Sequence, residues 1–183
     1  MADGVSVVAY DPAWPVLFRA VGDRLRNELG AVAKRIDHIG STAVVGLAAK
    51  PIIDIQVSVR SFEPLDDFRV PIHRAGFIYR PDNPERTKRY FRETPGERRT
   101  HIHVRRSGSF AEQFALLFRD FLRVHNARAA EYAELKHQLA EKFAAPGQRN
   151  AYVEAKKPFI WATIQLADAW AQSEGWEPSP SDF

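Results

Sequence analysis

The sequence predicts a single domain of the α+β class, with a mixed β-sheet and flanking helices followed by a helical C-terminal part. Apolar and polar residues alternate with a period of two in 52–59, and two later segments before residue 106 also have strand-like patterns. Beyond them, apolar residues recur at helical spacing. We therefore expect one domain with an α/β core in 1–106, a helical part in 107–172 and a frayed tail in 173–183.

The composition excludes several classes of protein. Of the 183 residues, which fit one ordinary domain, 45% are apolar and 27% charged, as in globular proteins. The absence of cysteine excludes a disulfide scaffold, a cysteinyl zinc knuckle, an iron–sulfur cluster and a thiol nucleophile. No apolar run approaches the ~20 residues of a membrane span, and Met1–Gly4 lack the basic and apolar regions of a signal peptide. We expect a soluble, cytoplasmic protein without a membrane partner.

Two helices are predicted in the first half of the chain. The first begins at Asp11-Pro12, where a capping residue precedes a proline suited to the first helical position, and runs to about Val32. Its apolar residues recur every four positions and form one stripe: Leu17, Val21, Leu25 and Leu29. The second, shorter helix is expected within Pro64–Ala75, with a kink or interruption at Pro71.

The strands are predicted from alternation and from turn residues. Ile52–Val59 alternates most clearly and presents Asp54 on its more polar face. Three further strands are expected at Phe77–Tyr79, Lys88–Glu93 and Thr100–Arg106. The last two are joined around Pro95-Gly96, which predicts an antiparallel hairpin.

Three helices are predicted after Ser109, which forms a capping box with Glu112. Their apolar stripes are, in order, Phe110, Phe114, Leu117, Phe118, Phe121 and Leu122; Tyr132, Leu135, Leu139 and Phe143; and Tyr152, Phe159, Ile160, Ile164, Ala167 and Trp170. Pro146-Gly147 ends the second helix. We interpret the aromatic residues of these stripes as core rather than as base-stacking groups.

The positive charge is concentrated in one segment. Residues 80–106 hold nine basic and four acidic residues, a net +5, whereas the whole chain carries a formal +3. The segment is either a solvated face or a patch that attracts a phosphorylated ligand. A net +5 confined to one segment is modest for a protein that follows a polymer, so nucleic acid is an unlikely partner.

A glycine and a serine precede the strand that carries Asp54. In Gly40-Ser41 the glycine lets the backbone approach a phosphate, to which the turn amides and the serine hydroxyl donate. A carboxylate on a neighbouring strand can then hold a magnesium ion that bridges the same phosphates. Gly40-Ser41 alone is typical of an ordinary turn, but together with Asp54 it predicts a phosphate site with Asp54 and Ser41 as candidate catalytic residues.

Gly40-Ser41, a spacer of twelve residues and Asp54 resemble the signature of the nucleotidyltransferase (DNA polymerase beta-like) superfamily, in which the strand carries two carboxylates at alternate positions. Gln56 stands at the second position. The wider pattern resembles the GrpB family in several blocks, among them His38-Ile39-Gly40-Ser41-Thr42, Gly46-Leu47-Ala48-Ala49-Lys50-Pro51, Thr100-His101-Ile102-His103-Val104, Phe118-Arg119-Asp120-Phe121-Leu122-Arg123 and Tyr152-Val153-Glu154-Ala155-Lys156-Lys157-Pro158.

This resemblance implies a nucleotidyltransferase-like sheet and a reaction in which a nucleotidyl group passes from a nucleoside triphosphate to an unknown acceptor. Asp54 would hold a divalent metal, magnesium or manganese. Because Gln56 brings no charge, an alternative is a nucleotide- or phosphometabolite-binding module without catalysis. A nucleotide or another phosphorylated small molecule is the partner in both cases.

Two histidines form a second candidate group. His101 and His103 share one face of their predicted strand, where the superfamily often has a third carboxylate, and imidazoles there would make zinc a further candidate. His38 is a possible third member. Basic side chains are candidates for binding phosphate oxygens: Lys50, Arg89, Arg92 and Arg99. Tyr152 and Lys156, four residues apart on a helix, are expected to close the cleft.

Overall fold

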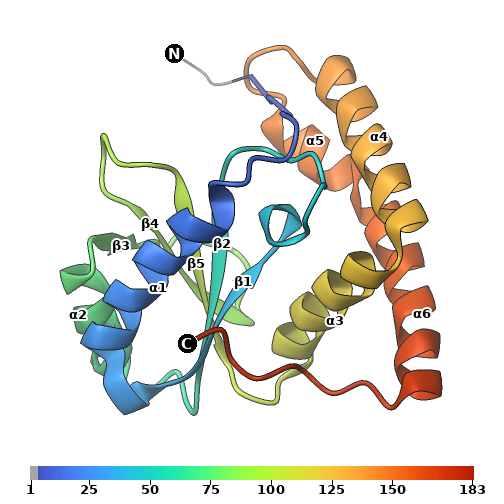
Figure 1. Cartoon of the computed structure of the whole chain (residues 1–183). Coiled ribbons are helices and arrows are strands. Elements are labelled where there is room, and N and C mark those ends of the chain that lie inside the picture. The colour runs from blue at the N-terminus through green and yellow to red at the C-terminus, as the bar shows by residue number, and fades with distance from the viewer. Residues whose placement is uncertain (1–3) are drawn as a thin grey trace.

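The computed structural model describes residues 4–183, so Met1–Asp3 of the predicted start lie outside the described residues. Five strands form one mixed sheet in the order β1-β2-β5-β4-β3 (Figure 1). Their bounds are Ala33–Ile39 (β1), Ile53–Val59 (β2), Phe77–Tyr79 (β3), Lys88–Glu93 (β4) and Thr100–Arg106 (β5). β2 and β5 pair in parallel, and every other neighbouring pair is antiparallel, including the hairpin predicted for β4 and β5.

The helices form two groups. α1 (Trp14–Leu29) and α2 (Asp66–Arg74) lie on one side of the sheet, and the C-terminal helices lie on the other side (Figure 1). The latter are α3 (Phe110–Val124), α4 (Asn126–Lys142), α5 (Arg149–Ala155) and α6 (Lys157–Glu174). In the part of the chain that the structure describes, no helix is both long and apolar enough to cross a membrane.

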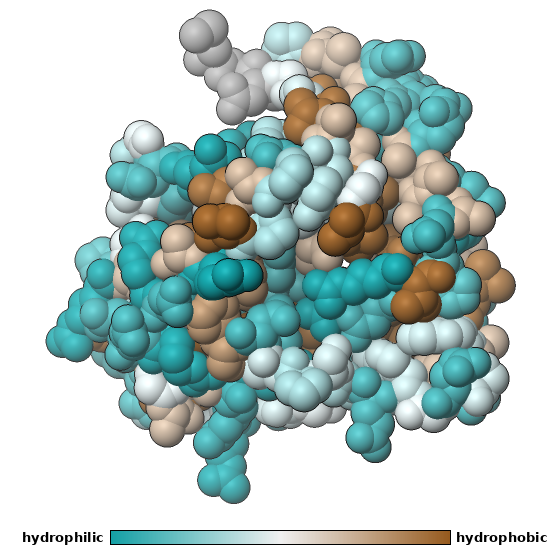
Figure 2. Space-filling model, viewed as in Figure 1, coloured by the Kyte–Doolittle hydropathy of each residue, from teal (hydrophilic) through white to brown (hydrophobic). Residues whose placement is uncertain are grey.

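Each group of helices has its own apolar cluster. One cluster joins α1 and α2 to the sheet, and its most buried members include Leu25, Ile36, Ile55 and Ile102. The other joins α3, α4 and α6 to the loop after β1, which contributes Val44 and Leu47. On the face seen in Figure 2, hydrophilic side chains cover most of the surface and hydrophobic ones form separate small patches. The loop after β1 is thus fixed between the two clusters.

The structure corrects the predicted start of α1 and shows that α2 continues through Pro71. Asp11 does not begin α1: its side chain accepts from the Ala13 amide at 2.8 Å, and the helix starts at Trp14 with Pro15 in its first turn. Pro71 does not interrupt α2, because a proline at the sixth helical position removes only one backbone hydrogen bond of a short helix.

The third predicted C-terminal helix consists of two helices. α5 ends at Ala155, and α6 begins at Lys157 with Pro158 in its first turn. The proline is favourable there because the amides of a first turn have no intrahelical acceptor. By contrast, the cap of α3 is as predicted, since Ser109 Oγ accepts from the Glu112 amide at 3.3 Å.

The tail predicted to fray instead packs along β1, the edge strand of the sheet. The Ile36 amide donates to Ser181 Oγ at 2.9 Å, and the His38 amide donates to Asp182 Oδ2 at 2.8 Å. The ring of Phe183 contacts that of Phe18 with centroids 5.5 Å apart. An edge strand exposes unpaired amides, and here side chains of the tail satisfy them.

A buried arginine connects β1, α3 and the tail. The Arg119 side chain is 1% exposed and forms an ion pair of 2.7 Å with Asp120. Its guanidinium also lies 3.9 Å from Asp37 and 3.7 Å from Asp182, and donates to the His38 carbonyl at 3.1 Å. Because Arg119 and Asp37 are buried, their charges depend on these partners within the protein.

We predict that Arg119→Met lowers the free energy of unfolding by about 3–5 kcal/mol, since it leaves the fully buried Asp37 carboxylate with one cationic partner fewer. Urea denaturation measures the loss. The control is Arg69→Met, which removes an exposed pair with Asp66 and is expected to leave stability essentially unchanged. Similar stabilities for the two variants would contradict the prediction.

Candidate functional site

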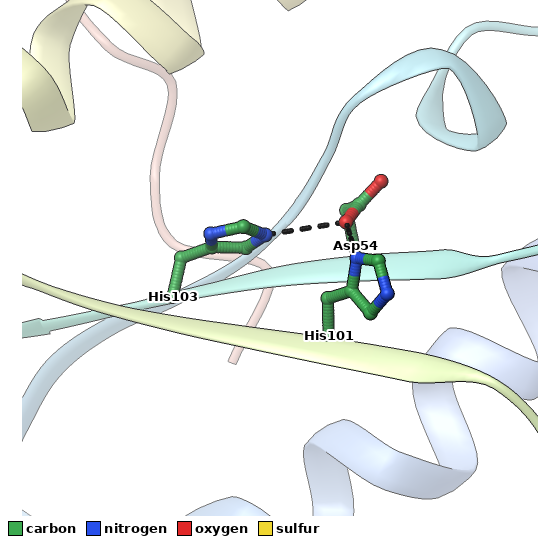
Figure 3. A group of neighbouring side chains, drawn as sticks. All are labelled: Asp54, His101 and His103. Carbon is green, nitrogen blue, oxygen red and sulfur yellow. Dashed lines mark hydrogen bonds and ion pairs between the residues drawn. The ribbon is translucent and has the colours of Figure 1, made fainter. Parts of the chain in front are cut away.

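Asp54 lies between the two histidines of the neighbouring strand. In the parallel pairing of β2 and β5, Asp54 is opposite His101. Asp54 Oδ1 is 3.0 Å from His101 Nδ1 and 3.2 Å from His103 Nε2 (Figure 3). The expectation that these strands are neighbours with the three side chains on one face is therefore confirmed.

The environment keeps Asp54 ionised and His103 neutral. Burial by itself raises the pKa of Asp54, but the hydrogen bonds with His101 and His103 outweigh this effect and hold that pKa below its usual range. Burial lowers the pKa of His103 to about 4. The group therefore presents one carboxylate and a neutral imidazole near neutral pH, the states in which both residues bind metals.

The three side chains fit a divalent metal ion. Their ligand atoms lie within 4.8 Å of one another. Atoms bound about 2.1 Å from a shared metal lie roughly 3.0–3.4 Å apart, close to the measured 3.0 and 3.2 Å. One carboxylate with two imidazoles suits zinc, manganese or iron better than magnesium. The ring of Tyr90 packs against both imidazoles, with centroids 5.5 and 5.4 Å away.

This group opens into a cavity of about 320 Å³ between the sheet and the C-terminal helices. The loop after β1 and the start of β2 line one side, and α4 and α5 line the other. The lining residues are Ser41, Thr42, Ala49, Lys50, Ile52, Asp54, His101, His103, Lys136, Arg149, Tyr152, Val153 and Lys156. The structure thus brings together Ser41, Lys50, Tyr152 and Lys156 with the metal-binding candidates, although the sequence separates them widely.

The cavity is strongly positive. Four cationic side chains line it, whereas Asp54 is the one carboxylate among the described residues of its lining. The ammonium groups of Lys50 and Lys156 lie 5.0 and 4.9 Å from the centre of the Tyr152 ring. Burial, aided by the charge of Lys156, lowers the pKa of Lys50 to about 8, and burial lowers that of Lys136 to about 7. Such a surplus of positive charge, most of it partly buried, favours an anionic ligand.

Gly40 is required by the close approach of its loop to Asp54. Its φ of +71° is strained for residues with a side chain. A Cβ atom there would lie 3.0 Å from Asp54 Oδ2, tighter than ordinary contact. The glycine therefore permits the loop that carries Ser41 to pass directly over the carboxylate.

Two predicted site residues lie elsewhere. His38 pairs with Ile55 on β2, so its ring points to the face of the sheet away from Asp54. There it stacks on the ring of Phe18, with the ring centroids 4.6 Å apart. Its Nε2 contacts Thr42 Oγ1 at 2.9 Å, which supports the loop rather than the metal-binding group. Arg89 is also on the opposite face and lies 4.3 Å from the centre of the Phe62 ring. Neither side chain lines the cavity, because successive side chains of a strand point to opposite faces and these two lie on the face away from Asp54.

The remaining predicted arginines lie beside the cavity without lining it. Arg92 pairs with His101 across β4 and β5, but its guanidinium is engaged by Glu93 at 3.0 and 2.5 Å. The charge of Arg99 contributes to the lowered pKa values of Lys50 and Arg149. Arg99 therefore adds to the positive field of the site.

Gln56 does not line the cavity. It is fully buried, and its Nε2 donates to the carbonyl of Glu112 at 3.4 Å. The first turn of α3 therefore covers the position at which the superfamily has its second carboxylate. Several buried atoms around it have no hydrogen-bond partner among residues 4–183, including Gln56 Oε1, Ser58 Oγ, His103 Nδ1, Arg105 Nε and Glu112 Oε1. Each such atom costs about 1–3 kcal/mol unless water satisfies it.

The sequence interpretation missed Lys136, Arg149 and Tyr90. Lys136 is 2% exposed and donates to the carbonyl of Ala48. Its position four residues after Tyr132, on the buried stripe of a helix, was a signal that could have identified it. Arg149 carried no such signal, because its proximity to the site depends on how α5 packs.

The family model of the GrpB protein matches residues 4–166. UPF0157 protein YqkA of Bacillus subtilis (strain 168) is 36% identical over 166 residues, which are 91% of this chain and 48% of that protein. Dephospho-CoA kinase of Mycolicibacterium paratuberculosis is 34% identical over 200 residues, an alignment that covers 95% of this chain and 48% of that protein. The chain thus spans about half the length of these curated relatives.

Solved structures agree with the family match. The crystal structure of conserved protein GrpB from Enterococcus faecalis has a TM-score of 0.79 and 33% identity, covering 90% of this chain and 99% of that one. A MgGTP-bound structure of the Cid1 poly(U) polymerase has a TM-score of 0.51 and 17% identity, and the match covers 74% of this chain and 44% of that one. The latter likeness shows the fold alone and supports the expected nucleotidyltransferase-like sheet. The extent of the family match and the similarity to these relatives show that the chain belongs to the GrpB family.

Proposed function

We propose that the chain binds a nucleoside triphosphate together with one divalent cation and transfers its nucleotidyl group. The observation that carries this proposal is the Asp54–His101–His103 group at a cavity with four cationic side chains. A metal-binding group beside buried positive charge suits a polyphosphate, whose oxygens can bind both a metal and ammonium groups. The nucleotidyltransferase-like fold supports the same class of reaction.

In this proposal Asp54, His101 and His103 hold the cation, which neutralises charge on the phosphate under attack when it is bound. The donor set favours manganese or zinc over magnesium, since two of the three ligands are imidazoles. Tyr90 restricts the orientation of both rings by packing against them.

The residues around the cavity hold the phosphates. Lys50 from the loop after β1 and Lys156 from the junction of α5 and α6 line the cavity, and Arg149 adds a fork of donors. Ser41 offers its hydroxyl from the loop that Gly40 places over Asp54. These contacts orient the chain of phosphates toward the carboxylate, a positioning effect that is itself a large part of phosphoryl-transfer catalysis.

The burial of Gln56 supports a second candidate function. A single carboxylate does not readily hold two dications against their repulsion, so a two-metal mechanism lacks a ligand here. A module that binds a nucleotide or phosphometabolite without transfer fits the same cavity. Metal-dependent release of pyrophosphate from a nucleoside triphosphate distinguishes the two: the enzyme releases it and the binding module does not.

We predict that binding of a non-hydrolysable ATP analogue depends on manganese and on the three ligands. Asp54→Asn and His103→Ala should each weaken manganese-dependent binding by more than about 100-fold, beyond the 10–100-fold typical of groups outside the metal's own ligands. Isothermal titration calorimetry measures this affinity. His137→Ala, which changes an exposed histidine of α4, is the control and should bind as the wild type does. Equal affinity with and without manganese would contradict the metal site.

A second prediction concerns two adjacent lysines. Lys156→Gln should weaken binding of the same analogue about 10-fold or more, because a charge-assisted hydrogen bond contributes roughly 1.5–3 kcal/mol. The matched control is Lys157→Gln, since Lys157 is exposed and pairs with Glu154 at 2.6 Å outside the cavity. Equal losses in both variants would show that the positive charge acts only through a general field.

The third prediction concerns pH. Lys50 has a pKa of about 8, so its ammonium group is present below that pH and is lost above it. Affinity for inorganic pyrophosphate without metal should therefore fall between pH 7 and 9, and Lys50→Arg should reduce this fall because arginine stays protonated. Because the ionisation of pyrophosphate affects both proteins equally, the ratio of wild-type to variant affinity at each pH reports the contribution of Lys50 alone. A constant ratio would contradict the role of Lys50.

A further inference from the structure

A buried tyrosine joins two lysines that reach the cavity from different parts of the fold. Tyr152 lies on α5, is fully buried and lines the cavity. Lys50 belongs to the loop after β1, and Lys156 lies at the junction of α5 and α6. Their ammonium groups are 5.0 and 4.9 Å from the centre of the Tyr152 ring, within the range of a cation–π contact. One ring therefore contacts two cations that lie far apart in the sequence.

The ring is the contact that these two ammonium groups share. In the part of the chain that the structure describes, neither Lys50 nor Lys156 has a hydrogen-bond or ion-pair partner for its ammonium group. Lys136, by contrast, donates to the carbonyl of Ala48. An ammonium group has three donors, so one that faces a ring keeps donors for a ligand in the cavity. The two lysines are thus held by the ring and still able to bind.

Without the ring, the two like charges would move apart. Burial lowers the pKa of Lys50, and the charge of Lys156 lowers it further, which reflects the repulsion between the two ammonium groups. A lysine side chain is long and flexible, and it samples many rotamers where nothing restrains it. The negative face of an aromatic ring attracts both ammonium groups and so opposes their separation.

The hydroxyl of Tyr152 is not what holds the lysines. It is buried and has no hydrogen-bond partner among the described residues. A buried hydroxyl without a partner is unfavourable for folding, and a phenylalanine would avoid that cost. The contacts that Tyr152 makes with Lys50 and Lys156 are made by its ring. The aromatic ring is therefore the part of Tyr152 on which the arrangement of the lysines depends.

We propose that Tyr152 is a positioning residue, whose ring gathers the ammonium groups of Lys50 and Lys156 at the cavity before a ligand with two linked phosphates binds. This inference rests on the anion binding in the proposed function and adds how its cations are arranged in advance. Two ammonium groups at one ring match a ligand that carries two neighbouring anionic groups. Side chains that are ordered before binding need not be ordered during it, which raises the affinity.

Two substitutions separate the ring from the hydroxyl. Tyr152→Phe keeps the ring and removes the hydroxyl, whereas Tyr152→Leu removes the ring and keeps an apolar side chain. The control is Tyr79→Leu, which removes a ring that packs on Phe91 of the neighbouring strand, with centroids 5.1 Å apart, outside the cavity. All are made in the full chain, and thermal melting reports their folding. The probe is inorganic pyrophosphate without metal, measured by calorimetry, so the result does not depend on the metal-binding group.

We expect Tyr152→Leu to weaken pyrophosphate binding about 5–30-fold, the range for ordering two lysine side chains during binding rather than before it. Tyr152→Phe and Tyr79→Leu should bind as the wild type does. In a Lys156→Gln background, Tyr152→Leu should cause a clearly smaller loss, because one of the two cations that the ring holds is gone. A purely structural role would give the same loss in both backgrounds and would contradict the proposal.

The outcomes separate this inference from the proposed function. Unchanged pyrophosphate affinity in Tyr152→Leu, or equal losses in Tyr152→Leu and Tyr152→Phe, would overturn the role of the ring and leave manganese-dependent nucleotide binding untouched. A loss confined to Tyr152→Leu, in a protein that binds no nucleotide with manganese, would keep the role of the ring and overturn the proposed function.

A second measurement applies if Tyr152→Leu does not fold. Proton NMR of the wild type, with signals assigned by Lys50→Arg and Lys156→Gln, reports the ε-methylene groups of the two lysines. Protons over the face of an aromatic ring are shifted upfield, so we expect upfield shifts for both lysines in the protein without ligand. Shifts like those of an exposed lysine would overturn the proposal.

Discussion

The parallel pairing of β2 with β5 is the interaction on which the rest of the site depends. Its register places Asp54 opposite His101 and, through the alternation of side chains, brings His103 to the same carboxylate oxygen. A slip of one residue would replace the imidazoles by Ile102 and Val104, which now belong to the apolar cluster beneath α1 and α2. The buried apolar face therefore enforces the register that assembles the polar one.

The helix α3 divides the polar face of these strands into an open and a closed part. Asp54 and the two histidines remain accessible to the cavity, whereas Gln56 and Ser58 are fully buried under the first turn of the helix. The closed part explains how a strand with a glutamine in place of a carboxylate stays compatible with the fold, since a second buried charge there would need a partner.

The balance of charge distinguishes the candidate site from the structural network near β1. In that network three arginines face three carboxylates at close range: Arg35, Arg119 and Arg123 against Asp37, Asp120 and Asp182. In the cavity four cationic groups face Asp54 alone. Partly buried positive charges that outnumber the carboxylates around them repel one another, and a bound anion would offset that repulsion. This imbalance supports the proposal that an anionic ligand binds in the cavity.

The sequence by itself determined the features that repeat over short distances. A period of two placed Asp54 on the polar face of its strand and His101 with His103 on one face, and caps and prolines indicated most of the helices. Only the tertiary structure decided that Arg89 and His38 point away from Asp54, because the orientation of a face depends on which strand pairs with which. It also brought Lys136 and Arg149 to the cavity and the tail to β1. These contacts join residues far apart in the chain, and their formation depends on the packing of whole helices, which no local pattern contains.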